Sequence, residues 1–251
     1  MNDVSIPRRY KEINYDQNEL PNYIKQVLQL EAVACKDWLT NKVDRCVTGR
    51  VAQQQGVGEL HLPLSNCGVT ALDYTGQKGI ATSIGHAPVS ALIDPKKGSN
   101  TAIAEALTNI VFAPLEKGLE SVSLSANWMW PCNNPGEDAR LYQAVQECSD
   151  FAIALGINIP TGKDSLSMKQ KYPDGDVLAP GTVIISAAGQ CKDVNQIITP
   201  VARWNGGDFY YIDFAQDSFH LGGSSFAQSQ DRIGTETPYV QDATYFKTAF
   251  N

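Results

Sequence analysis

The sequence is poor in positive charge and has no long apolar run. It contains 20 Lys and Arg residues against 27 Asp and Glu residues, and its formal net charge is -7. No run of Lys and Arg is longer than two residues, as at Lys96-Lys97. The electrostatic footprint of a general nucleic-acid binder is therefore missing. No segment approaches the roughly 18 to 20 apolar residues that span a bilayer. The polar start, MNDVSIPRRYKEINYD, also lacks the apolar core of a secretory signal, so we expect a cytoplasmic protein without nucleic-acid or membrane partners.

Cysteine and histidine patterns of known chemistry are also absent. The six cysteines form no C-x-x-C pair, and none has a histidine at zinc-finger spacing. This argues against a structural zinc site and a dense disulfide framework, and predicts reduced, buried thiols. No G-x-S-x-G elbow is present, and His61, His86 and His220 have no nucleophile partner in the sequence. We therefore assign no catalytic residue to this chain.

Strand patterns recur along the chain. The segments VTALDYT (69–75) and KGIATSIG (78–85) are expected to pair through a hairpin turn between Gly76 and Gly79. Further strands are expected in the first half of SVSLSANWMW, over TVIISAAGQ (182–190) and over DFYYIDF (208–214). Because the segment 182–190 is apolar almost throughout, we expect it to be covered on both faces.

Helical patterns are mixed with these strands. Helices are expected from Glu19 to near Leu30, from just after Ser99-Asn100 to Pro114, and from Asn134-Pro135 to Gly156. Strands and helices do not alternate strictly, so the fold class is α+β bordering on α/β.

The chain is expected to have three parts. Residues 1–30 form a linker arm and a helix, residues 31–204 form one domain, and residues 205–251 start a second domain. This last part is too short for an independent core, because domains below roughly 40 to 60 residues are only marginally stable.

A pair of oxygen-bearing side chains lies on the second expected helix. Glu105 and Asn109 are four residues apart, so they lie on one side of that helix, about 40° apart around its axis. A carboxylate and an amide oxygen in this arrangement can share Mg²⁺, whose shell is usually completed by phosphate and water. The alternative is an ordinary solvated helix face.

Two segments could contact anions. PTGKDSLSMK (160–169) is not a Walker A motif, yet it offers backbone amides, a cation and a hydroxyl. The alternative is a polar turn with a solvated lysine. SANWMWPCNNPGED (125–138) leads into a helix N-terminus that could bind an anion, or its tryptophans could serve only for packing.

Five blocks of the sequence carry a family resemblance: DRCVTGRVAQQQGVGELHLPLSNCGVTALDY, EALTN, LSANWMW, PGEDARLY and TGKDSLSMK. In order and spacing they resemble the phosphoribosylformylglycinamidine synthase family, in its large single-chain form. The resemblance runs from about residue 19 to the end and matches the second of two internal repeats, each similar to aminoimidazole ribonucleotide synthase. It implies an α/β-like N-terminal half with a mixed sheet, helices on one side and pairing through the sheet, followed by the start of a C-terminal half.

The resemblance also implies an activity. The family uses ATP and ammonia released from glutamine to convert formylglycinamide ribonucleotide to formylglycinamidine ribonucleotide in purine biosynthesis. The paired repeats form one working nucleotide site and one auxiliary site that holds ADP.

Site residues carried over from the family fall into two groups. Glu105 and Asn109 match Mg²⁺ ligands of the auxiliary site, Asn66 stands at a metal position that is usually Asp, and Lys36 matches a nucleotide-contacting lysine. Asn66 is a neutral and weaker ligand for a hard cation. The residues implied near ATP phosphates and substrate at the working site are Asn127, Gly162, Lys163, Asp164 and Ser165. They are expected to position and stabilise charge and not to act as nucleophiles.

The first repeat and the glutaminase domain of the family are absent from this sequence. We therefore expect a fragment that needs those parts as partners and is inactive alone. One alternative is a self-sufficient, homodimeric ATP-dependent relative similar to aminoimidazole ribonucleotide synthase. Another is a non-enzymatic interaction module, which would bind no nucleotide. Because a repeat that normally pairs exposes an apolar sheet face, the isolated chain is expected to self-associate.

Overall fold

The computed structural model describes residues 10–40, 49–61, 64–216 and 219–251. Its centre is a six-stranded sheet in the order β1-β2-β3-β8-β4-β5. The strands are β1 (Val51–Gln53), β2 (Cys67–Ala71), β3 (Gly79–His86), β4 (Val122–Met129), β5 (Asn158–Ser165) and β8 (Thr182–Cys191). β4 and β5 are parallel and the other neighbours are antiparallel. The predicted mixed sheet is confirmed.

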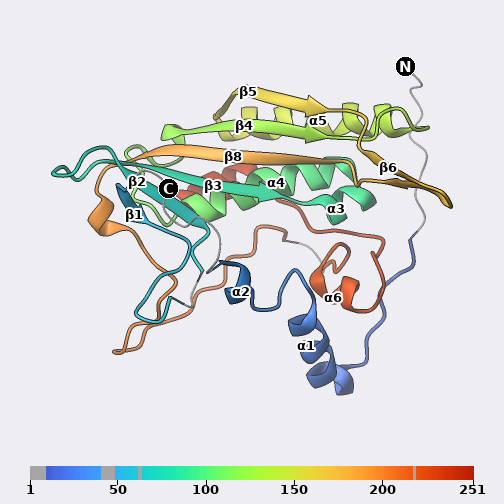
Figure 1. Ribbon diagram of the computed structural model, residues 1–251, viewed down its shortest axis with the longest axis horizontal. Coiled ribbons are helices and arrows are strands. Elements are labelled where there is room, and N and C mark those ends of the chain that lie inside the picture. The colour runs from blue at the N-terminus through green and yellow to red at the C-terminus, as the bar shows by residue number, and fades with distance from the viewer. Residues whose placement is uncertain (1–9, 41–48, 62–63, 217–218) are drawn as a thin grey trace.

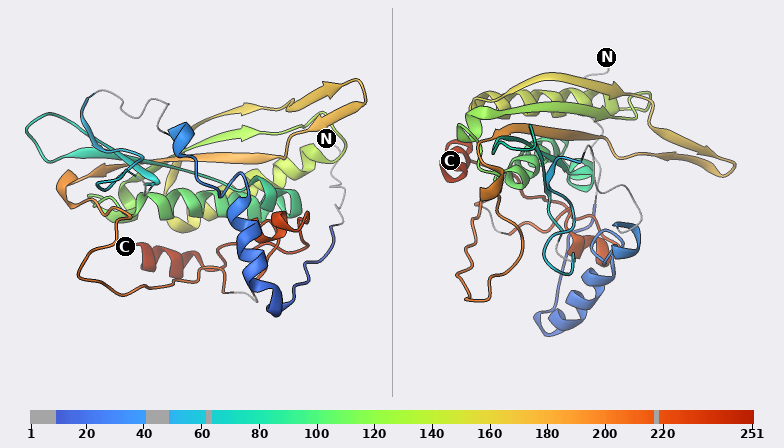
Figure 2. Two further views of the ribbon diagram at one scale, coloured as in Figure 1. Left: turned by 60° about the horizontal axis from the view of Figure 1, so that its bottom comes forward. Right: turned by 60° about the vertical axis from the view of Figure 1, so that its left-hand side comes forward.

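The helices that pack on this sheet are long and lie on one side of it (Figures 1 and 2). α4 packs against β3 and β8, and α5 packs against α4. The bounds of the helices are α1 (Leu20–Gln29), α2 (Asp37–Thr40), α3 (Pro88–Ile93), α4 (Pro95–Ile110), α5 (Glu137–Leu155), α6 (Ser225–Ser229) and α7 (Ala243–Phe250). The predicted placement of helices on one side is therefore confirmed.

Three short 3-10 helices and a small hairpin complete the described structure. The 3-10 helices are η1 (Gln17–Glu19), η2 (Gly118–Ser121) and η3 (Val194–Gln196). The hairpin of β6 (Lys169–Tyr172) and β7 (Gly175–Leu178) projects from one end of the sheet (Figure 1). Within the described residues, no helix is long and apolar enough to cross a membrane.

The core lies between the sheet and α4, α5 and α7. Ile103, Leu107 and Ile110 of α4 are fully buried, and Ile185 of β8 and Phe246 of α7 are also 0% exposed. Burying an aliphatic or aromatic side chain of this size contributes about 1.5–3 kcal/mol. The core is therefore continuous from the sheet to the last helix of the chain.

The other face of the sheet is open, which corrects one expectation. Burial alternates along β8, so that Ile185 and Ala187 are buried while Ser186 and Ala188 are exposed. The prediction that this strand is covered on both faces is wrong. Small residues on the open face made the segment look apolar throughout in the sequence. In the structure only every second side chain enters the core.

Two other element predictions need correction. α4 begins at Pro95, six residues before the expected start at Thr101, because Asp94 caps it by accepting from the backbone N–H groups of Lys96 and Lys97. No strand is present over 208–214, a segment that the structure describes in full. In this segment Phe209 and Tyr210 are 101% and 85% exposed.

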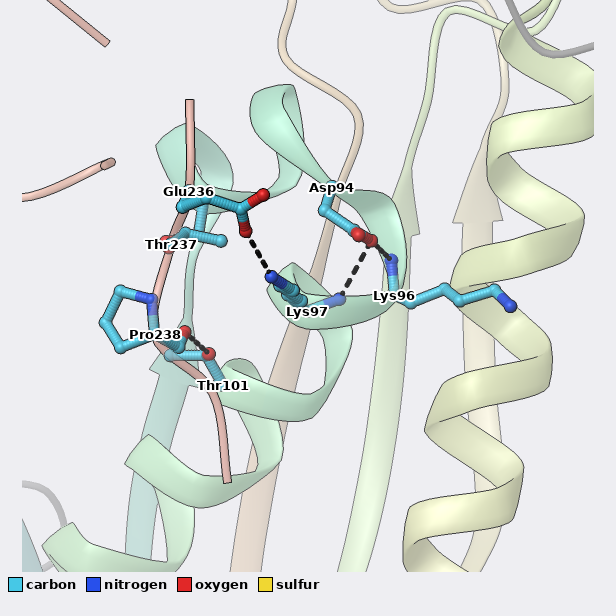
Figure 3. Close-up of polar contacts among 8 residues, drawn as sticks. Asp94, Lys96, Lys97, Thr101, Glu236, Thr237 and Pro238 are labelled. Carbon is cyan, nitrogen blue, oxygen red and sulfur yellow. Dashed lines mark hydrogen bonds and ion pairs between the residues drawn. The ribbon is translucent and has the colours of Figure 1, made fainter. Parts of the chain in front are cut away.

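Residues 236–240 run across the start of α4 and join the C-terminal part to the domain (Figure 3). Nζ of Lys97 lies 2.7 Å from Oε2 of Glu236, and Oγ1 of Thr101 donates to the carbonyl of Pro238 across 3.3 Å. The side chain of Asn100 bonds both backbone groups of Val240: Nδ2 donates to the carbonyl at 3.2 Å and Oδ1 accepts from the amide at 2.9 Å. Hydrogen bonding to Lys97 also lowers the pKa of the Glu236 carboxyl. These contacts place α7 against α5.

Candidate nucleotide site

The site begins where β3 extends beyond its neighbour β2. β2 pairs with β3 from Ala71↔Gly79 to Cys67↔Ser83, whereas β3 continues to His86. Backbone groups of Ile84 and His86 therefore lack a strand partner on that edge. α4 approaches β3 closely here, because a Cβ at Gly85 would lie 2.2 Å from the carbonyl oxygen of Ala102. The close approach lets side chains of α4 reach the edge of β3.

Glu105 and Asn109 occupy this edge. Oε2 of Glu105 accepts from the backbone N–H of His86 at 2.6 Å, and Nδ2 of Asn109 donates to the carbonyl of Ile84 at 2.9 Å. Nδ2 of Asn66, one residue before β2, donates to Oδ1 of Asn109 at 3.3 Å. The structure therefore brings Asn66, which precedes β2, to Glu105 and Asn109 of α4, although β3 and α3 lie between them in the sequence.

A buried glutamine positions the segment that carries Asn66. Gln53 is 5% exposed, and its Nε2 donates to the carbonyl of Cys67 at 3.0 Å and to the hydroxyl of Ser65. These bonds fix the residues on both sides of Asn66. The sequence analysis did not identify Gln53, and the run of three glutamines that contains it gave no sign of its role.

An open cavity of about 800 Å³ extends from this cluster across the bare face of the sheet. Asn66, Glu105 and Asn109 line one part, and the hydroxyl groups of Ser125, Thr161 and Ser186 line another. The hydroxyl residues were missed, although Ser123 and Ser125 alternate with buried residues in β4 and could have indicated a polar strand face. The cavity is large enough for a nucleotide-sized ligand.

The second group of expected residues divides between the two faces of the sheet. In the parallel pair β4–β5, Asn127 lies opposite Lys163, and Met129 lies opposite Ser165. Because Val122, Leu124 and Ala126 face the core, alternation places Asn127, Lys163 and Ser165 on the open face. Nζ of Lys163 donates to Oγ of Ser165 at 2.6 Å. These three residues continue the face that carries the cavity.

Gly162 and Asp164 lie on the other face, opposite Ala126 and Trp128. A smaller open cavity of about 440 Å³ at the edge strand β5 is lined by both of them and also by Thr161 and Lys163. A Cβ at Gly162 would be 2.4 Å from the carbonyl oxygen of Ala126, so this position requires glycine. The face assignment depends on a bulge, since Ser123 pairs with Asn158 but Ser125 pairs with Thr161.

Asn127 is polar and only partly satisfied. Its Oδ1 is buried and has no hydrogen-bond partner among the described residues. Buried polar atoms are nearly always bonded to protein, water or ligand. This oxygen is therefore a candidate acceptor for a donor group of a bound molecule.

Lys36 is not brought to the large cavity. Its Nζ donates to the carbonyl of Ala34 at 3.0 Å, and it lines a separate cavity of about 390 Å³ with His61 and Leu64.

The donor set of the first cluster fits a resident Mg²⁺ poorly. It contains a single carboxylate, Glu105, and the amide oxygen of Asn109 already accepts from Asn66. Over residues 10–40, 49–61, 64–216 and 219–251, no group of three or more His, Cys, Asp or Glu side chains is placed to hold a metal. Any cation here would depend on ligands that the nucleotide supplies.

Comparison with known proteins identifies the family. A family model described as FGAR-AT PurM_N-like domain matches residues 35–190. The chain is 43% identical over 217 residues to phosphoribosylformylglycinamidine synthase of Homo sapiens. This alignment covers 86% of the chain and 16% of the human protein. It is 42% identical over 235 residues to the probable chloroplastic/mitochondrial phosphoribosylformylglycinamidine synthase of Arabidopsis thaliana, with 92% and 17% covered.

Among solved structures, PurLQS from Thermotoga maritima aligns with a TM-score of 0.49 and 14% identity, covering 79% of this chain and 29% of that chain. The chain spans about a sixth of the length of the curated relatives named above. The match of the family model to residues 35–190 and the identity to these relatives agree. The chain therefore belongs to the FGAR-AT PurM_N-like domain family.

Proposed function

We propose that this chain contributes the nucleotide-binding half of a site in a phosphoribosylformylglycinamidine synthase. Five relatives of that name or probable name are 38–43% identical to it over 86–98% of its length. The proposed reaction converts formylglycinamide ribonucleotide, glutamine and ATP to formylglycinamidine ribonucleotide. Because the chain spans only 16–19% of each relative, its proposed partners are the first repeat and the glutaminase domain. Alone it is expected to bind but not to catalyse.

The observation that carries the proposal is the polar open face of β4, β5 and β8. Lys163 supplies a cation, Ser165 and Ser125 supply hydroxyl groups, and the buried Oδ1 of Asn127 offers an acceptor. The cation and the hydroxyl donors, fixed on strands, are suited to hold phosphates and to stabilise charge that develops on them. ATP or ADP is the proposed ligand, and Mg²⁺ would enter with its phosphates.

The other expected residues have more distant proposed roles. Gly162 keeps β5 close to β4, and Asp164 faces the smaller cavity. Lys36 would contact the nucleotide only after moving from its bond with Ala34. These roles rest on the family resemblance more than on the contacts of the structure.

The open sheet face is also the proposed pairing surface. Ile80 and Ile84 point outward from β3 and are 44% and 56% exposed. An exposed face of this kind favours association with a matching sheet. We expect dimers or larger species of the isolated chain in light scattering. A monomer that persists at micromolar concentration would contradict the pairing proposal.

The cytoplasm is the proposed location. The described cysteines, Cys35, Cys67, Cys132, Cys148 and Cys191, are all free, as is usual in a reducing compartment. A fluorescent fusion of the whole native protein, imaged in its source cell, tests the location. Signal confined to an organelle would overturn it.

Calorimetric titration with ATP and ADP in the presence of Mg²⁺ tests the nucleotide proposal. Lys163→Met should weaken binding about tenfold, which corresponds to about 1.4 kcal/mol. Lys171→Met is the matched control, because Lys171 is an exposed lysine of β6 that lines neither the large cavity nor the smaller one that Lys163 lines. Equal loss in both variants would indicate a general charge effect. Absence of binding in the wild-type chain would refute nucleotide binding by this chain alone.

A further inference from the structure

The cluster of Asn66, Glu105 and Asn109 is bonded to itself and to the edge of β3. We infer that Asn66 determines whether this cluster binds a free divalent cation, and that with asparagine here it binds none. In this reading Glu105 and Asn109 replace the missing strand partner of β3, and Asn66 bonds Asn109. The inference concerns the chain without nucleotide, so it does not depend on the proposed function.

Both polar atoms of the Asn109 amide are engaged within the protein. Its Nδ2 donates to Ile84 at 2.9 Å, and its Oδ1 accepts from Asn66 at 3.3 Å. The amide N–H of Asn66 therefore places partial positive charge beside the oxygen that a cation would need. A cation could bind only if the Asn66 side chain rotated away.

Glu105 is also engaged. Its Oε2 accepts from the amide of His86 at 2.6 Å, which satisfies a backbone group that β2 does not reach. The remaining charge of the cluster is one carboxylate. Affinity for hard cations depends on ligand charge, and Mg²⁺ gives up its water reluctantly, so a single engaged carboxylate is insufficient.

Replacement of Asn66 by Asp tests whether this residue decides divalent-cation binding by the cluster. The substitution keeps the shape of the side chain, removes the N–H donor to Asn109 and adds a second carboxylate to a cavity wall that already carries Glu105. Without a cation, oxygen would then face oxygen, and the melting temperature should fall. A divalent cation that bridges the carboxylates should restore it.

The experiment titrates the chain with Mn²⁺, without nucleotide, and follows free Mn²⁺ by electron paramagnetic resonance. We expect no saturable binding in the wild-type chain and at least tenfold tighter binding in Asn66→Asp. Melting temperatures with and without Mg²⁺ should rise with the metal in Asn66→Asp only.

Two controls separate the charge from other effects. Asn66→Ala removes the amide without adding a charge and should bind no Mn²⁺. Glu105→Gln in the Asn66→Asp background should abolish the acquired binding. Saturable 1:1 binding by the wild-type chain that Glu105→Gln abolishes would overturn the inference, and this test remains if Asn66→Asp does not fold. Equal affinity of Asn66→Asp and Asn66→Ala would also overturn it.

Discussion

The indole of Trp130 donates a hydrogen bond to Oε2 of Glu137 across 3.1 Å in the protein interior, where the two residues are 1% and 4% exposed. Trp130 directly follows β4, and Glu137 is the first residue of α5. Oε1 of Glu137 also lies 3.7 Å from Nε of Arg140, and Nη2 of Arg140 donates to the carbonyl of Leu92 near the end of α3. One buried network therefore connects the strand that carries Asn127 with two helices.

Removal of the Glu137 carboxylate should destabilise this network. We expect Glu137→Ala to lower the free energy of unfolding by about 3–5 kcal/mol, because Arg140 would stay buried without that carboxylate. Glu137→Gln keeps an acceptor for Trp130 and should cost less. Urea unfolding measures both, with the exposed Glu120→Ala as control, expected within about 0.5 kcal/mol of wild type. An equal effect of Glu120→Ala would contradict the role of the network.

The contact between β3 and α4 at Gly85 leaves no room for a methyl group. A Cβ there would lie 2.2 Å from the oxygen of Ala102 and 2.3 Å from the nitrogen of Ala106. Gly85→Ala should therefore cost about 3 kcal/mol, because helix backbone must move. At Gly68 the nearest atom would be 3.5 Å away, so Gly68→Ala should change stability by less than about 1 kcal/mol. Chemical unfolding measures the free energy of unfolding of both variants. Similar losses would contradict the view that the close approach of β3 and α4 excludes a side chain at Gly85.

Buried thiols should make stability fall at alkaline pH. Desolvation raises the pKa of Cys148 from the usual 9.0 to about 12 and that of Cys67 to about 11. Between pH 9 and these values the folded chain binds more protons than the unfolded chain, so the free energy of unfolding decreases as pH rises. Cys148→Ala should flatten this slope by up to about 1.4 kcal/mol per pH unit. Unfolding curves from pH 8 to 11 measure the slope, and an unchanged slope would be inconsistent with a thiol that stays protonated.

Asn100 should be the main attachment of the C-terminal segment. Asn100→Ala leaves the amide and carbonyl of Val240 without their partner in a buried place, and we expect a loss of about 3 kcal/mol. Lys97→Met, which breaks the partly exposed pair with Glu236, should cost at most about 1 kcal/mol. Hydrogen exchange of α7 should accelerate in the first variant. If the second variant accelerates it more, the ion pair and not Asn100 holds the segment.

The sequence predicted most of the sheet from patterns that act locally. The hairpin between β2 and β3, the strand before Trp130 and the glycine that ends α5 all follow from short-range turn and capping chemistry. The early start of α4 was also readable, because Asp94-Pro95 is a capping residue followed by proline at the first helical position. The expected start just after Ser99-Asn100 followed the apolar stripe instead, although both of these residues are buried.

The site was only partly predictable because it depends on long-range packing. Helical spacing predicted that Glu105 and Asn109 share one side of α4, and the structure shows both at the edge of β3. Nothing in the spacing indicated that β3 extends beyond the end of β2. Nor did it indicate that Glu105 and Asn109 would hydrogen-bond to backbone groups of β3. Likewise the open face of β8 could not be distinguished from a buried one, since small residues such as Ala188 suit either environment.

The bulge in the pairing of β4 with β5 sets the electrostatic sign of the open face. Between the pairs Ser123↔Asn158 and Ser125↔Thr161, β5 advances by one residue more than β4. A regular ladder continued from Ser123↔Asn158 would instead place Gly162 beside Asn127 and Asp164 beside Met129, and it would turn Lys163 to the other face. One extra residue in the pairing thus decides whether β5 presents a lysine or a carboxylate on the open face, with no change in the amino acids that follow.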